Sequence, residues 1–157
     1  MKPVRRIVCA DGPDGKSKAV HDGPSPDVRT DPARPGFSST VIWVTDRTPA
    51  RIDCATEIDR FAHVLSPPPG GSCCQIISLP PDRAFGDGAR TPRPAMRKTR
   101  TLDFCIVLEG EITLVLDTEE VHLKVGETVV QRGTNHAWSN RSDAPCVIAI
   151  SSHDATY

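Results

Sequence analysis

Residues 97–140 read RKTRTLDFCIVLEGEITLVLDTEEVHLKVGETVVQRGTNHAWSN, and this stretch decides the fold. It holds four short runs rich in aliphatic and β-branched residues, at 104–108, 111–116, 121–124 and 128–131. Glu109-Gly110 separates the first two runs and Val125-Gly126 separates the last two, which is the spacing of strands in β-hairpins. The stretch therefore predicts a β unit, and the rest of the chain is expected to wrap around it.

The flanking segments add further predicted strands, at 4–9, 18–21, 41–45, 74–79 and 146–151. The unbroken apolar run 146–150 is typical of a strand in the middle of a sheet. Residues 22–39 and 84–95 are expected to be loops, and apolar residues at helical spacing favour a short helix within 48–62. Fifteen prolines and eleven glycines oppose long helices, so the sequence predicts an all-β protein.

The composition excludes several classes of function. A net charge of −1 gives no basic face, so nucleic acid is not an expected partner. We see neither an apolar run that could span a membrane nor a secretory leader, so no membrane partner and a cytoplasmic location are expected. The six cysteines match no zinc spacing and are expected to be reduced.

A glycine-and-histidine pattern closes the 97–140 stretch. Gly133, His136 and Asn140 have the spacing of the second motif of the cupin superfamily, with Gln131 in place of the usual proline. The first cupin motif ends in an acid and a glycine separated by six residues, and Asp103 and Gly110 fit it with Asp for the usual Glu.

The chain therefore resembles a small cupin. This resemblance implies a jelly-roll β-barrel over residues 41–157, with residues 1–40 forming a strand and an extended loop that pack on the barrel. Cupins commonly pair through edge strands, and open edges need covering. A homodimer is thus expected, with residues 4–9 as the candidate contact.

The resemblance breaks at the two metal-binding histidines of the first motif. The matching region holds no histidine, and the closest alignment puts Arg97 and Thr99 at those positions. Arginine has no lone pair to donate and its fixed charge repels a cation. At ~4 Å and an effective dielectric near 20, one pair of unit charges is worth ~4 kcal/mol. We therefore expect no metal cofactor. The alternative is a divalent metal held by Asp103, His136 and one of His63, His122 or His153.

Without a metal, the residues at these positions suit acid–base chemistry. We predict His136 as acid or base, Asp103 as its orienting partner or as a base, and Arg97 as the group that stabilises a carboxylate or enolate. Thr99, Gln131, Trp138 and Cys105 are predicted to contact substrate.

Several of these residues have a structural alternative. Asp103 could pair with Arg97 in a salt bridge, and His136 could be a relic of an ancestral metal site. Trp138 and Cys105 could simply belong to the core.

Three functions follow as hypotheses. The first is a lyase-type or isomerase-type cupin acting without metal on an anionic or enolisable small molecule, by dehydration, isomerisation or decarboxylation. The resemblance places such enzymes in catabolism or natural-product biosynthesis. The second is a metal-dependent oxygenase or decarboxylase with altered ligands, and the third is a non-catalytic module that binds an anionic small molecule.

Overall fold

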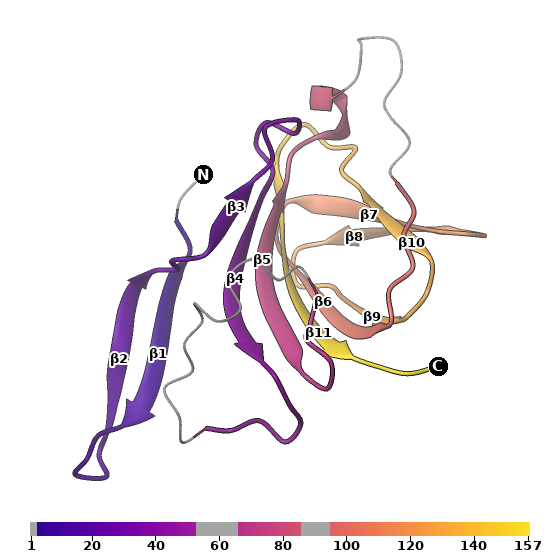
Figure 1. The fold of residues 1–157 in the computed structure, drawn as a ribbon. Helices are drawn as coiled ribbons and strands as arrows, with labels where there is room; N and C mark the ends of the chain where they lie inside the picture. The colour runs from indigo at the N-terminus through magenta and orange to yellow at the C-terminus, as the bar shows by residue number, and fades with distance from the viewer. Residues whose placement is uncertain (1–2, 53–65, 86–94) are drawn as a thin grey trace.

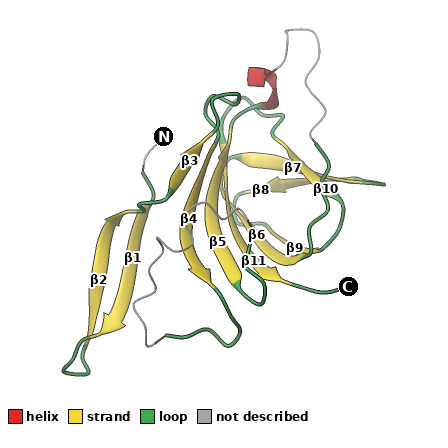
Figure 2. Ribbon diagram, viewed as in Figure 1, coloured by secondary structure: helices red, strands yellow, loops and turns green. Residues whose placement is uncertain are grey.

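The computed structural model describes residues 3–52, 66–85 and 95–157 of the 157-residue chain. Nearly all of the regular structure is β, as Figure 2 shows, which confirms the predicted all-β class. Within these ranges we find no helix with the length and hydrophobicity needed to cross a membrane.

The described strands, labelled as in Figure 1, are β1 (Arg5–Asp11), β2 (Ser17–Pro24), β3 (Val28–Thr30), β4 (Ser38–Thr45), β5 (Ser72–Leu79), β6 (Thr101–Glu109), β7 (Glu111–Leu116), β8 (Glu120–Lys124), β9 (Thr128–Arg132), β10 (His136–Ser139) and β11 (Cys146–Asp154). A 3₁₀ turn, η2 (Asp82–Phe85), follows β5.

A six-stranded antiparallel sheet forms one side of the molecule, in the order β3-β4-β5-β11-β6-β9. The last strand, β11, lies between β5 and β6, which confirms a central position for the apolar run 146–150. Alternate residues of β6, among them Asp103, Cys105 and Val107, are buried toward the interior, while Phe104 and Ile106 between them are exposed. This period of two is that of a sheet with one covered face.

A three-stranded sheet, β10-β7-β8, packs opposite and closes the jelly roll (Figure 1). The hairpin prediction was right about the turns and wrong about the pairing. Strand β7 pairs with β8 and β6 pairs with β9, whereas β6 does not pair with β7, nor β8 with β9. The stretch therefore forms one long hairpin, with β6 and β7 in one arm and β8 and β9 in the other. The hairpin bends so that β6 and β9 lie in the larger sheet and β7 and β8 in the smaller one. Its bend lies where Gly126 N–H donates to Val107 C=O (2.9 Å), close to Gly110.

The core lies between the two sheets. Ile112 and Leu114 from the smaller sheet pack against Val107 and Ile148 from the larger one in a single buried cluster. Burying such aliphatic side chains contributes roughly 1.5–3 kcal/mol each. This core sets the distance between the two sheets, and therefore the width of the part of the barrel interior that the core does not fill.

Strands β1 and β2 form a separate two-stranded ribbon that projects from the barrel (Figure 1). The predicted loop 22–39 in fact contains β3, which pairs with β4 at the edge of the large sheet. Part of the predicted N-terminal segment 1–40 thus belongs to the barrel sheet. Of the helix predicted within 48–62, residues 48–52 are not helical and the rest lies outside the described residues, as does most of the loop 84–95.

Candidate active site

A cavity of about 710 Å³ opens between the two sheets. Its volume falls within the range of pockets that hold small molecules. The cavity is lined by Arg97, Thr99, Asp103, His136 and Trp138 of the predicted site, together with residues from β3, β4, β5 and β11. The structure therefore brings five of the seven predicted site residues to one cavity.

Arg97 and His136 are tied together by their backbones. Arg97 N–H donates to His136 C=O at 2.8 Å, and His136 N–H donates to Arg97 C=O at 2.9 Å. Residues paired directly in this way carry their side chains on the same side of the strands. Arg97 is exposed and His136 is buried, and both line the cavity.

The tautomer of His136 follows from its neighbour. Its Nδ1 lies 2.9 Å from the Thr134 carbonyl oxygen, which can only accept, so Nδ1 carries the proton and donates. In the neutral ring this leaves the lone pair on Nε2, which has no hydrogen-bond partner among the described residues. Trp138, on the same strand, meets the imidazole edge to face with ring centroids 6.3 Å apart. Nε2, the nitrogen that can accept a proton, is therefore free of hydrogen bonds to the described residues.

Asp103 lies on β6 with its side chain buried. The Thr101 hydroxyl is 2.9 Å from Asp103 Oδ2 and 2.8 Å from Thr99 Oγ1. Because a hydroxyl has one proton and an ionised carboxylate only accepts, Thr101 donates to Asp103 and accepts from Thr99. Oδ1 of Asp103 is buried and has no hydrogen-bond partner in the described chain. One carboxylate oxygen is thus held in place and the other is left unsatisfied by the protein.

The salt bridge considered as an alternative role for Asp103 does not form. Within the described residues no ion pair joins Asp103 to Arg97, although both line the cavity. The guanidinium of Arg97 is therefore not neutralised by the carboxylate in this arrangement.

Two predicted substrate contacts, Gln131 and Cys105, do not line the cavity. Gln131 is paired with Asp103 across β9 and β6, and its Oε1 accepts a hydrogen bond from Thr134 Oγ1. Cys105 packs in the core cluster, and burial, with a smaller effect of the Asp103 charge, raises the pKa of its thiol to about 12. Its sulfur is therefore a neutral thiol near pH 7, which agrees with a core role.

The sequence did not point to several other residues of the cavity. Thr101 hydrogen bonds to Asp103, Ser152 pairs with Asp103 across β11 and β6, and Arg29, Phe37 and Phe85 also line the cavity. The alternation along β6 could have indicated Thr101, which lies two residues before Asp103. No local signal indicates Arg29, because its strand has only three residues.

The residues present do not fit the metal site that the cupin fold implies. Of its four ligand positions only Asp103 and His136 carry ligating groups, and no three His, Cys, Asp or Glu side chains gather as possible ligands in the described ranges. His122 is exposed beside Glu111 on the outside, and His153 contacts Ser151 and Phe104. The third candidate, His63, lies outside the described residues.

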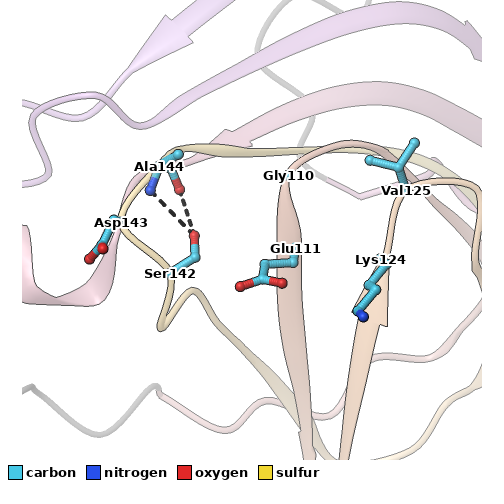
Figure 3. A pocket seen from close by; sticks show the side chains of 7 residues that line it. All are labelled: Gly110, Glu111, Lys124, Val125, Ser142, Asp143 and Ala144. Carbon is cyan, nitrogen blue, oxygen red and sulfur yellow. Dashed lines mark hydrogen bonds between the residues drawn. The ribbon is translucent and has the colours of Figure 1, made fainter.

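A second hollow, of about 570 Å³, lies on the surface and contains none of the predicted site residues. Figure 3 shows it beside the bend of the long hairpin, bordered by Gly110, Glu111, Lys124, Val125, Ser142, Asp143 and Ala144. The Ser142 hydroxyl donates to the Ala144 carbonyl at 2.9 Å within the turn before β11. The residues that border this hollow thus include both acidic and basic side chains, and some of them are engaged in local turn contacts.

Comparison with known proteins agrees with this architecture. The sequence model of the family described as "Cupin domain" matches residues 87–152. The cupin domain of Schizosaccharomyces pombe Cnp3 superposes on 96% of this chain and 87% of its own, with a TM-score of 0.54 at 7% identity, a likeness of fold alone. The chain therefore has a cupin fold, and residues 87–152 carry the sequence pattern of the cupin domain.

Three proteins of similar sequence come from fungi. Phomopsin biosynthesis cluster protein C' of Diaporthe leptostromiformis is 38% identical over 65% of this chain and 52% of its own length. Oryzines biosynthesis cluster protein J of Aspergillus oryzae is 27% identical over 88% and 75%. A cupin-domain-containing oxidoreductase of Hypocrea virens is 30% identical over 65% and 50%. The chain thus spans about half the length of several of the relatives it matches.

Proposed function

We propose that this protein is a small-molecule cupin enzyme of a biosynthetic pathway that performs metal-independent acid–base chemistry on an enolisable carbonyl or carboxylate substrate. Relatives from the phomopsin and oryzines biosynthesis clusters support the biosynthetic setting. The observation that carries the chemistry is the unengaged Nε2 of His136, in one cavity with Arg97 and the half-satisfied carboxylate of Asp103.

The proposed mechanism begins with proton transfer from carbon. His136 Nε2 takes the proton next to the substrate carbonyl, and the electrons of the broken C–H bond move onto the carbonyl oxygen. Arg97 donates hydrogen bonds to that oxygen and stabilises its developing charge. The proton then returns from His136, either to a different carbon, which isomerises the substrate, or to a β-hydroxyl, which leaves as water.

Exchange of the proton with solvent tests this step without knowledge of the substrate. The chelator-treated protein is mixed in D₂O with 2-oxobutanoate, levulinate or phenylpyruvate, and loss of the α-proton signal is followed by NMR. We expect His136→Ala to slow the catalysed exchange about 100- to 10,000-fold, the usual contribution of a general base. Asp103→Asn should slow it as well.

The matched control is His122→Ala. His122 is exposed on β8 beside Glu111 and does not line the cavity, so the exchange rate should be unchanged. Thermal unfolding checks that each variant is folded. Exchange by His136→Ala at the wild-type rate would refute the role of His136. Tight binding of these acids without any exchange would instead favour a non-catalytic binding module.

A metal-dependent oxidoreductase is the second candidate, and the name of the Hypocrea virens relative favours it. Elemental analysis of protein purified without a histidine tag or chelator separates the two. Stoichiometric iron, manganese, nickel or zinc would support the oxidoreductase, whereas chelator-resistant proton exchange by metal-depleted protein would support the acid–base enzyme.

A further inference from the structure

We propose that Arg29 forms a second anion-binding subsite in the cavity, on β3, four strands along the large sheet from Asp103 on β6. On this proposal, which builds on the proposed function, the ligand is elongated and carries an acidic group distant from its reacting carbonyl or carboxylate. Three features of the cavity support this subsite: the position of Arg29, its unsatisfied donors and the apolar residues between Arg29 and Asp103.

The position of Arg29 is set by the pairing of β3 with β4. Arg29 lies directly opposite Ser39, and both residues line the cavity. The Ser39 hydroxyl is engaged, because it donates to Gln75 Oε1 at 2.7 Å. Only 23% of the Arg29 side chain is accessible to solvent, so its guanidinium belongs to the wall of the cavity rather than to the outer surface.

The hydrogen-bonding edge of this guanidinium is unsatisfied by the protein. Nε and Nη2 of Arg29 are buried and find no acceptor among the described residues. Arg29 forms an ion pair with Asp27, but Asp27 Oδ1 lies 3.9 Å from Nε, too far for a hydrogen bond. Nε and Nη2 form the edge that grips a carboxylate through two parallel N–H···O bonds. A ligand carboxylate is the group that this edge fits.

Two acidic residues and another arginine of the cavity, in contrast, are engaged by protein groups. Asp82 accepts from the Ser139 hydroxyl at 2.6 Å, and Asp31 accepts from Ala33 N–H at 2.9 Å. Arg34 packs its guanidinium over Phe37 and Phe85, 4.8 and 5.4 Å from the ring centroids. Arg29 is thus the cavity arginine with buried donors that no protein group satisfies in the described ranges.

The separation of Arg29 from Asp103 along the sheet favours an elongated ligand. Arg29 is on β3 and Asp103 on β6, and β4, β5 and β11 lie between them. Four strand spacings of about 4.8 Å therefore separate the two strands along the sheet, although its curvature shortens the path through the interior. Ile77 on β5 and Ile150 on β11 line the cavity between these two strands, and Phe37 and Trp138 add aromatic faces. The middle of the ligand should be apolar or aromatic.

Binding of simple acids tests the subsite. The probes are α,ω-dicarboxylates from succinate to sebacate and the monocarboxylates of equal chain length, titrated by calorimetry into the full chain. We expect one length of dicarboxylate to bind at least tenfold more tightly than its monocarboxylate. Arg29→Gln should remove that advantage and leave the monocarboxylate Kd unchanged. The control Arg132→Gln, at an exposed position of β9 outside the cavity, should retain the advantage.

Two outcomes would overturn the subsite. The first is that no dicarboxylate binds the wild type more tightly than the monocarboxylate of equal length. The second is that Arg29→Gln retains the full preference for the dicarboxylate. If Arg29→Gln does not fold, Arg29→Lys replaces it. That variant keeps the charge but loses the paired donors, and an undiminished advantage in it would refute recognition by the guanidinium edge. Because binding is measured without turnover, failure of the His136 exchange test and failure of this subsite are distinguishable.

Discussion

Buried thiols make the stability of this protein depend on pH on the alkaline side. Burial raises the pKa of Cys105 to about 12 and those of Cys73 and Cys146 to about 11, from an ordinary value of 9.0. The unfolded chain therefore loses these protons at lower pH than the folded protein. The stabilisation is complete below pH 9 and is lost as the pH rises toward the folded-state values.

We therefore predict that Cys105→Ala flattens the fall in unfolding free energy between pH 8 and pH 10. The wild type should lose roughly 1 kcal/mol per buried thiol over this interval. The variant should be less stable at pH 8, because a buried sulfur is lost, but should lose less on going to pH 10. Urea unfolding at both pH values measures the difference.

Cys9→Ala is the matched control, because Cys9 is exposed and its loss should leave the pH dependence unchanged. Equal losses of stability in the wild type and in Cys105→Ala would contradict the prediction.

At the level of elements, the bend of the long hairpin depends on Gly110. Its φ of +73° is a left-handed conformation, and an added Cβ would lie 2.7 Å from the Pro145 carbonyl oxygen. Gly126, in the other arm of the bend, has a φ of +85° but nothing within 4 Å of the same added atom. The two positions share the backbone strain and differ in the steric clash.

Gly110→Ala should therefore destabilise the protein more than Gly126→Ala. Left-handed strain is expected to cost about 1–2 kcal/mol in each variant. The clash in Gly110→Ala should add ~1–3 kcal/mol, as other overpacked sites do. Urea unfolding of the two variants gives the comparison, and equal destabilisation would mean that the turn before β11 shifts without cost.

The strands themselves could be predicted because their signals are local. Alternation and turn residues placed β4, β5, β6 and β11, and motif spacing placed Asp103 and His136 at one cavity. The pairing of β6 with β9 could not be predicted in this way, because nothing in either run specifies a partner beyond the next turn. Arg29 was missed for the same reason, since a three-residue strand has no period to detect.

For the whole molecule we propose a homodimer formed through the β1–β2 ribbon. The ribbon projects from the barrel and exposes Ile7 and Val20, each about half accessible (52% and 54%). Both of its edges are unpaired in the described chain, and such edges invite a further strand. The outer face of β6, with Phe104 and Ile106 exposed, is the competing surface.

Light scattering at micromolar concentration should give twice the 17.0 kDa mass of the chain. Ile7→Lys should yield monomers, and Ile106→Lys should leave the dimer intact. The reverse pattern would move the interface to β6, and a monomeric wild type would contradict the dimer altogether.

The central position of β11 also has a consequence for the order of events during synthesis. β11 emerges from the ribosome after all other described strands, yet β5 and β6 meet only through it. Until β11 is made, the edges of β5 and β6 that will pair with it are open. Asp103, which lies on β6, is then not yet held in the complete sheet. We therefore expect the nascent chain to remain vulnerable to aggregation until β11 is complete, and the cavity to form only at that point.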